Sequence, residues 1–218
     1  DFQEISLNNY FSFIFTVFWI VGIINAINWI DGLDGLASGF SFIVFVALFF
    51  IVQDNFSESY KILNLALAGS SFGFLFYNFH PSKIIMGDCG SNYLGYNIAI
   101  LSLICNSTNG VNEISTNHLS YFPILILFIP IIDMAYVILC RLKENKSPFF
   151  PDRKHLHHRL LNVGLNVPST VFLILLITEL FAITAVTLVK NQFPFLIFIV
   201  YLAFDIFIIK RTNVKFSK

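Results

Sequence analysis

Seven apolar stretches dominate the sequence, and most have roughly the length of a helix that crosses a membrane, about 20 residues, whereas the second and fourth are shorter. They are Asn8–Ile30, Leu36–Val52, Lys61–Phe79, Ser91–Cys105, His118–Cys140, Ser169–Val189 and Phe193–Ile209. Only 12% of the residues are charged, which is too few to cover the surface of a water-soluble globule of this length. The sequence therefore predicts an all-α, polytopic integral membrane protein with about seven transmembrane helices, forming a single domain over residues 1–218.

Basic residues fall unevenly on the two sides that alternating spans would create. Of the 13 Lys and Arg residues, only Lys61 and Lys190 lie on one side. The other 11 lie after the third stretch, after the fifth stretch and in the C-terminal tail. Because basic loops stay in the cytoplasm, this side is predicted to be cytoplasmic, and residues 141–168 are predicted to form a cytoplasmic loop rich in basic residues and histidine. The net charge of zero gives no indication of nucleic-acid binding.

The first residues resemble an external loop rather than a natural start. The chain begins at Asp1 without Met and without the basic region of a signal peptide. We therefore expect an N-terminally truncated piece of a longer protein. The three cysteines, Cys89, Cys105 and Cys140, show no metal or disulfide spacing.

The first predicted cytoplasmic connection carries a polar residue at every third position: Asn25, Asn28, Asp31 and Asp34. On an α-helix, neighbours in such a series share a face. Helix capping explains one Asn or Asp at this place, but not four beside an apolar span, where ionisable groups are costly and usually functional. We call residues 25–39 the first motif.

The second motif is Met86-Gly-Asp-Cys-Gly-Ser91. Its glycines predict a turn into the N-terminus of a helix, whose free N–H groups can hold phosphate. Asp88 could bind a hard cation there. An ordinary helix N-cap is an equally good interpretation of this motif alone.

The third motif, residues 151–158, contains His155, His157 and His158 beside Arg153 and Lys154. Zinc binding is one interpretation of the histidines, but the basic neighbours would repel a cation. A site for phosphate anions fits better, whereas a solvated cytoplasmic loop explains Lys and Arg but not His. Together the three motifs place hard-cation ligands beside phosphate-binding groups, which indicates Mg²⁺-dependent phosphoryl transfer.

With these residues the chain resembles the polyprenyl-phosphate N-acetylhexosamine-1-phosphate transferases of glycosyltransferase family 4. The resemblance covers about residues 25–161: Asn-x-x-Asn-x-x-Asp-Gly-x-Asp-Gly-Leu-Ala, Met-Gly-Asp-x-Gly-Ser and Pro-Asp-Arg-x-His-Leu-His-His occur in order. The third motif is similar to that of the bacterial subgroup acting on UDP-N-acetylglucosamine and related sugars, and differs from that of the muramoyl-pentapeptide branch. Beyond it, the last two stretches match only in hydropathy.

The resemblance implies an Mg²⁺-dependent enzyme, with Mn²⁺ as a substitute, that transfers a sugar-1-phosphate from a UDP-N-acetylhexosamine to undecaprenyl phosphate and releases UMP. This would initiate cell-envelope polysaccharide synthesis, such as that of O-antigen. Predicted catalytic residues are Asp31, Asp34, Asp88, His155, His157 and His158. Predicted substrate-binding residues are Asn25, Asn28, Arg153, Lys83, Gly87 and Ser91. The predicted metal ligands are Asn28 and Asp88. Asp133 matches a further family acid without a definite role.

The resemblance also implies a bacterial inner-membrane location, with the active site facing the cytoplasm, the lipid bilayer as a partner and a homodimer as an option. One departure is the missing Asp-Asp pair of the family, from which we expect the chain alone to be inactive. The sequence leaves the sugar and the pathway open. A transporter with intramembrane acids at Asp133, Glu179 and Asp205 is an alternative, and a nonenzymatic scaffold is a third. Acids of a transporter would lie at midplane on several helices, whereas these motifs gather at one surface.

Overall fold

The apolar stretches form helices because every backbone N–H and C=O inside a membrane must be satisfied within its own segment. The computed structural model describes residues 9–52, 58–106 and 121–216, and these contain helices and no strands. The helices are α1 (Asn9–Ile30), α2 (Leu36–Val52), α3 (Glu58–Asn78), α4 (Gly87–Asn106), α5 (Phe122–Ile126), α6 (Phe128–Lys143), α7 (Leu156–Asn162), α8 (Val167–Lys190) and α9 (Phe195–Phe216). The all-α prediction is confirmed for the described residues.

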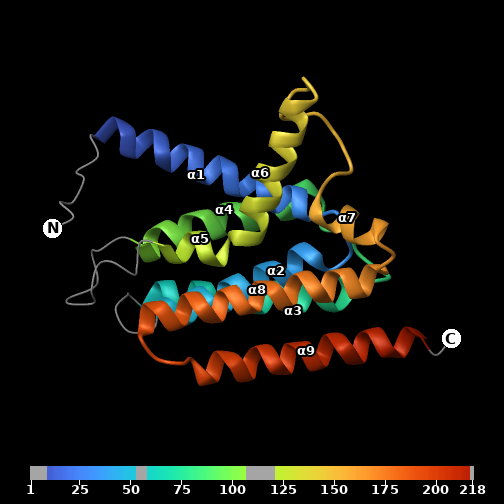
Figure 1. The fold of residues 1–218 in the computed structure, drawn as a ribbon. Coiled ribbons are helices and arrows are strands. Elements are labelled where there is room, and N and C mark those ends of the chain that lie inside the picture. Colours follow the sequence, from blue (N-terminus) through green and yellow to red (C-terminus); the bar gives the residue numbers. More distant parts are fainter. Residues whose placement is uncertain (1–8, 53–57, 107–120, 217–218) are drawn as a thin grey trace.

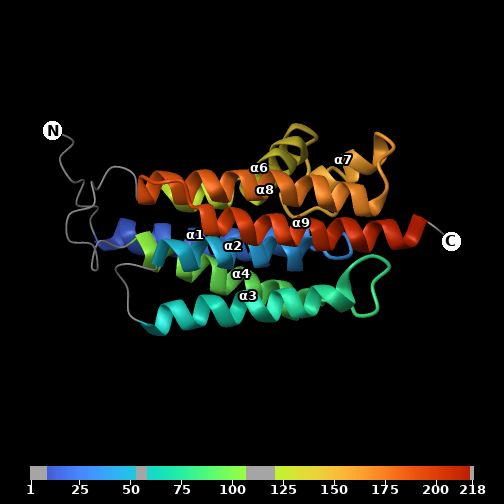
Figure 2. The same ribbon diagram turned by 90° about the horizontal axis from the view of Figure 1, so that it is seen from below.

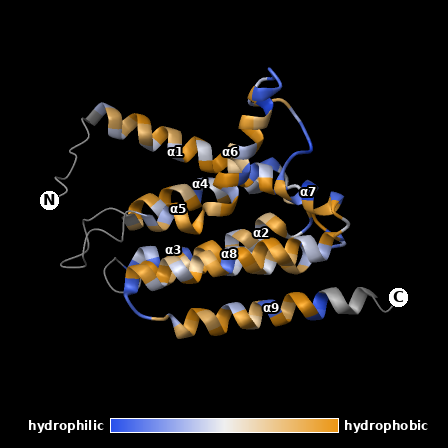
Figure 3. Cartoon of the chain, viewed as in Figure 1, coloured by the Kyte–Doolittle hydropathy of each residue, from blue (hydrophilic) through white to orange (hydrophobic). Residues whose placement is uncertain are grey.

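Most of the long helices run back and forth along one axis, so their connections gather at two ends (Figures 1 and 2). The connections 31–35 and 79–86 and the short helix α7 lie at the same end, which carries the three motifs. We call it the motif end. Hydrophilic residues concentrate there and at the upper tip of α6, whereas the helices between are largely apolar (Figure 3).

The helix α2 is the centre of the bundle and is buried on nearly all sides. It packs against α3, α4 and α8. At Gly39 a Cβ atom would come within 2.7 Å of Leu175 Cδ1 on α8, so the Leu175 side chain packs directly over this glycine. Tyr201 of α9 donates a hydrogen bond across 2.8 Å to the carbonyl of Ile43 on α2, which ties the last helix to the centre.

Two helical segments of the described chain are long and apolar enough to cross a membrane, Tyr10–Ile30 and Val167–Lys190. The helix Leu36–Val52 is also apolar but shorter. Length and composition thus support an apolar, membrane-type helical protein, and the count of seven spans stays a prediction.

The predicted continuous span His118–Cys140 is wrong. Its first residues lie outside the described residues, and the remainder is divided at Leu127 into α5 and α6. Pro130 lacks the N–H that would bond the carbonyl of Ile126, and its ring crowds that carbonyl. The helix axis therefore turns, and α6 leaves the direction of the other helices (Figure 1). This turn brings the third motif back over the motif end.

The first motif is divided between a helix and a turn. The first predicted stretch ends at Ile30, and so does α1. Asn28 therefore lies on the helix, whereas Asp31 and Asp34 lie in the turn that follows. Gly35 has a φ of +84°, a conformation that favours glycine and ends the helical path.

Candidate active site

The first and second motifs meet because α1 and α4 pack at close range. A Cβ atom at Gly95 of α4 would come within 2.9 Å of the Cα atom of Ile24 on α1. One turn further toward the motif end, Asn28 Nδ2 donates to Asp88 Oδ1 across 3.1 Å and to Ser91 Oγ across 3.0 Å. The absence of a side chain at Gly95 thus lets these polar groups touch.

The helix α4 begins at Gly87, as the second motif predicted, with a φ of +65° at this glycine. Asp88 stands exposed in the first turn, where the partial positive charge of the helix end favours a carboxylate. Ser91 is fully buried and its hydroxyl donates to the carbonyl of Gly87 across 3.2 Å. Ser91 therefore holds the first turn in place and leaves Asp88 free to face outward.

Asp31 lies beside two other carboxylates. Burial, and then the charges of Asp88 and Asp34, raise the pKa of Asp31 to about 6. Such an excess of negative charge favours a bound cation, because a nearby positive charge stabilises the ionised form. The carboxylates of the first two motifs therefore lie close enough for Asp88 and Asp34 to raise the pKa of Asp31.

Asp34 holds the connection 79–86 against the connection 31–35. Its Oδ2 lies 2.9 Å from His80 Nδ1 and accepts a hydrogen bond from the Ser82 N–H across 3.1 Å. Burial acts to raise the pKa of Asp34, but the hydrogen bonds from His80 and Ser82 outweigh it and hold the pKa below its usual value. Asp34 is thus an ionised carboxylate that joins the two connections through its contacts with His80 and Ser82.

Asn78 is a site residue that sequence reasoning missed. Its Oδ1 accepts bonds of 3.0 Å from the Gly35 N–H and from the Ser38 hydroxyl, and its Nδ2 donates to the Ile84 carbonyl across 3.0 Å. The side chain is buried. Its place at the end of the third apolar stretch was visible, but its three bonds were not.

The third motif lies against the first through His157. A Cβ atom at Gly32 would come within 2.3 Å of His157 Nε2, so the imidazole occupies the space that glycine leaves. Burial, followed by the neighbouring His158 and His155, lowers the pKa of His157 to about 4. The pKa of His158 is also lowered, first by burial and then by His155 and Arg153. His157 is therefore uncharged at neutral pH, a hydrogen-bonding group rather than a cation.

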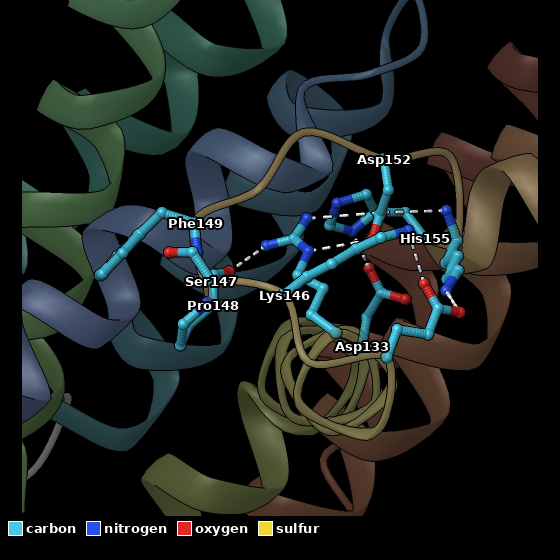
Figure 4. Close-up of polar contacts among 10 residues, drawn as sticks. Asp133, Lys146, Ser147, Pro148, Phe149, Asp152 and His155 are labelled. Atoms are coloured by element: carbon cyan, nitrogen blue, oxygen red, sulfur yellow. Dashed lines mark hydrogen bonds and ion pairs between the residues drawn. The ribbon is translucent and has the colours of Figure 1, made fainter.

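Two buried contacts on α6 hold the third motif, and neither was predicted from the spacing. Arg141 Nε donates to Asp152 Oδ2 across 2.9 Å, and Arg141 Nη1 donates to the carbonyl of Pro148. The guanidinium carbon also lies 4.7 Å from the centre of the Trp29 ring on α1. Figure 4 shows Asp133, Asp152 and His155 gathered on one side of α6. The connection is thus fixed to both α6 and α1.

The remaining predicted residues differ in their surroundings. Asn25 bonds the Val21 carbonyl within its own helix. Lys83 and Arg153 are exposed. His155 is buried and lies beside Asp133, with 2.9 Å between Nδ1 and Oδ2. The structure therefore brings together most of the predicted residues, and their catalytic and binding roles stay predictions.

Oxygen donors suited to a hard cation are Asp88, Asp31 and Asn28. The described part of the chain contains no group of three or more His, Cys, Asp or Glu side chains arranged to hold a metal. Mg²⁺ commonly takes only one or two protein carboxylates and completes its shell with water and substrate phosphates. The donor set fits that pattern, provided that the Asn28 amide turns so that its oxygen faces the ion.

An apolar helical bundle that carries carboxylates, amides and uncharged imidazoles defines a membrane-type protein with a cluster of polar side chains at one end. Residues 1–106 match the model of glycosyl transferase family 4. Together with the relatives described next, this match supports the family that the three motifs predicted, glycosyl transferase family 4.

Curated relatives agree with this assignment. The chain is 41% identical over 140 residues to a probable undecaprenyl-phosphate N-acetylglucosaminyl 1-phosphate transferase of Bacillus subtilis, covering 64% of the chain and 38% of the relative. It is 38% identical over 121 residues to the decaprenyl-phosphate N-acetylglucosaminephosphotransferase of Mycobacterium leprae, covering 53% of the chain and 30% of the relative. It is 31% identical over 135 residues to the undecaprenyl-phosphate alpha-N-acetylglucosaminyl 1-phosphate transferase of Salmonella typhimurium, covering 62% and 32%.

The chain thus spans less than two fifths of the length of each of these three relatives. All three of these relatives are named as transferases, which gives no support to the transporter alternative.

Proposed function

We propose that this chain forms the main part of the site of a sugar-1-phosphate transferase, which moves N-acetylglucosamine-1-phosphate or a related group from a UDP-sugar to a polyprenyl phosphate. The observation that supports this best is the convergence of the three motifs. Asn28 touches Asp88, Asp34 touches His80, and His157 rests on Gly32. The names of the relatives support the same acceptor chemistry.

In the proposed reaction, an oxygen of the lipid phosphate forms a bond to the phosphorus attached to the sugar. The bond from that phosphorus to the UMP oxygen breaks, and UMP leaves with the electron pair. Such transfers depend mainly on positioning and on neutralising charge. The proposed roles of the protein are to hold both phosphates at the start of α4 and to exclude alternative geometries with the third motif.

We propose that Mg²⁺, or Mn²⁺ in its place, binds at Asp88 and Asn28 and neutralises the pyrophosphate oxygens when bound. Asp31 would add negative charge to that site. Arg153 and Lys83, which are exposed, would supply the positive charge for substrate phosphates. His157 and His158 would contribute hydrogen bonds to sugar or phosphate oxygens.

The membrane arrangement is part of the same proposal. Seven spans would place the three motifs at the cytoplasmic face of a bacterial inner membrane, with 11 of the 13 basic residues on that side. The lipid phosphate would then reach the site from the bilayer, and the UDP-sugar from the cytoplasm. The homodimer remains a prediction without a contact in the structure to support it.

The test is release of UMP from UDP-N-acetylglucosamine in detergent with undecaprenyl phosphate and Mg²⁺. It uses the chain itself and a chimera in which the chain replaces the matching part of the Bacillus subtilis relative. We expect turnover by the chimera and none by the chain alone. An inactive chimera beside an active unmodified relative would contradict the proposal, as would UMP release that does not require the lipid phosphate.

A further inference from the structure

The carboxylate of Asp133 on α6 accepts two hydrogen bonds from the third motif, one at each oxygen. The Leu156 N–H donates to Oδ1 across 2.6 Å, and Oδ2 lies 2.9 Å from His155 Nδ1. A carboxylate of this kind only accepts, so the hydrogen of the second contact belongs to His155 Nδ1. The Asp133 side chain is 5% exposed, and Figure 4 shows it directed at His155.

From His155 a row of rings leads to the first motif. The His155 ring lies edge-on to Trp29, with 5.5 Å between ring centres. Its other neighbour is His157, stacked at 5.7 Å with an interplanar angle of 6°. His157 in turn lies 4.3 Å from His158 and rests on Gly32. The position of each ring thus depends on the ring before it, and the row begins at Asp133.

Asp133 differs in this respect from Glu179, another acid within the apolar stretches. Glu179 Oε1 is buried without a hydrogen-bond partner, whereas both oxygens of Asp133 are used. An acid on an ion path would have to exchange partners, which this arrangement does not favour. The geometry indicates instead an acid with a fixed structural task close to the reaction site.

We propose that Asp133 is a positioning residue for the transfer reaction. It sets the tautomer and orientation of His155 and the start of α7, and through them the places of His157 and His158 against the first motif. The role of Asp133 in the transfer reaction rests on the proposed function, whereas its hydrogen bonds to the third motif do not. Asp133 touches neither substrate and acts only through the histidines.

Replacement by asparagine tests this directly. Asn offers one oxygen where Asp offers two, so Asp133→Asn must lose the bond to the Leu156 N–H or present an N–H to His155 Nδ1. In the second case the ring proton moves to Nε2. Asp133→Glu keeps two acceptors and is the rescue variant. Glu179→Gln, an equally buried carboxyl that contacts none of the motifs, is the matched control for loss of a buried acid.

The first measurement is ¹⁵N NMR of the full chain with labelled histidine rings, with His155 assigned from its loss in His155→Gln. We expect a proton on Nδ1 of His155 in the native chain and altered signals of His155 and His157 in Asp133→Asn. A native His155 without a proton on Nδ1 would overturn the proposal, as would unchanged ring signals in the variant. This readout requires no turnover, so it stands even if the proposed function fails.

The second measurement is turnover by the chimera. Because a displacement of about 1 Å in a reaction site can cost about 100-fold in rate, we expect Asp133→Asn to lower kcat on that order with KM for the UDP-sugar little changed. Asp133→Glu should recover part of the loss and Glu179→Gln should show none. Equal losses in Asp133→Asn and Glu179→Gln, with native histidine signals in both, would reduce Asp133 to a general packing role and overturn the inference.

Discussion

The amide of Asn28 on α1 donates to the carboxylate of Asp88 on α4 across 3.1 Å, although 60 positions separate the two residues in the chain. The same amide reaches Ser91, one turn further into α4. The contact joins the last turn of one helix to the first turn of another at the motif end.

If Asn28 and Asp88 share a metal ion, then Asn28→Ala should weaken its binding without removing the acid. Loss of a supporting group typically costs about 10–100-fold in metal affinity or activity. We expect the Mg²⁺ concentration for half-maximal UMP release by the chimera to rise by that factor. Asn97→Ala is the control, because Asn97 on α4 bonds only the Tyr93 carbonyl of its own helix. An unchanged Mg²⁺ requirement in Asn28→Ala would contradict the shared ligand.

Much of the helix arrangement could be predicted from hydropathy, because a long apolar stretch has few alternatives in a membrane. Leu36–Val52 was predicted at both ends as the structure has it, and α1 began one residue later than expected. The break at Leu127 was missed because apolar composition hides the effect of Pro130. A proline is tolerated in the first turn of a helix but breaks or kinks the interior. The sequence did not show where the helix containing Pro130 begins, so the effect of this proline could not be predicted.

The site was predicted as a set of residues, but not as a geometry. The predicted stretches placed Asp31 and Asp34 between Ile30 and Leu36, where the structure has them, but the spacing did not show which groups they contact. Asn78, Trp29 and Arg141 were not predicted as site residues, because their roles arise from contacts between distant segments. Trp29, for example, joins the third motif only through Arg141 and His155.

Gly32→Ala should displace the third motif. The new Cβ atom would lie within 2.3 Å of His157 Nε2, so the His157 ring must move away from the first motif. We expect turnover by the chimera to fall about 100-fold. Gly73→Ala is the matched control, since a Cβ atom at Gly73 on α3 meets nothing within 4 Å. Similar activities of the two variants would show that His157 need not rest on the first motif.

Acid should release His157 from the first motif. Its pKa is about 4 in the folded protein, against 6.5 for an ordinary histidine, so the unfolded or released state binds the proton more readily. The contribution of His157 to docking is therefore complete above pH 6.5 and is lost as the pH falls toward 4. The pKa difference limits this loss to about 3 kcal/mol.

Trp29 reports this transition, because its ring lies beside His155 and Arg141. In a Trp19→Phe background it is the remaining tryptophan of the two in the chain. We expect its fluorescence to change with a midpoint between pH 4 and pH 6.5, and we expect His157→Gln to remove that change. A transition that persists in His157→Gln would assign it to another group, such as Asp31.

The contact between Arg141 and Asp152 should stabilise the connection 144–166 far more than an exposed ion pair does. Both side chains are largely buried, with 3% and 12% of their surfaces exposed, and Arg141 also bonds the Pro148 carbonyl. Removing one partner of a buried pair leaves the other uncompensated and costs about 3–5 kcal/mol. Arg141→Ala should therefore speed tryptic cleavage at Arg153 and Lys154 by at least about 100-fold.

Arg141→Lys should restore little of this protection, because an ammonium cannot reproduce the planar guanidinium that reaches Asp152 and Pro148 together. Lys61→Ala supplies the control. Lys61 pairs with Glu58, whose side chain is 78% exposed, and such pairs contribute less than about 1 kcal/mol. If Arg141→Ala and Lys61→Ala were cleaved in this connection at the same rate, the buried pair would not hold it, and the third motif would have to be positioned by Asp133 alone.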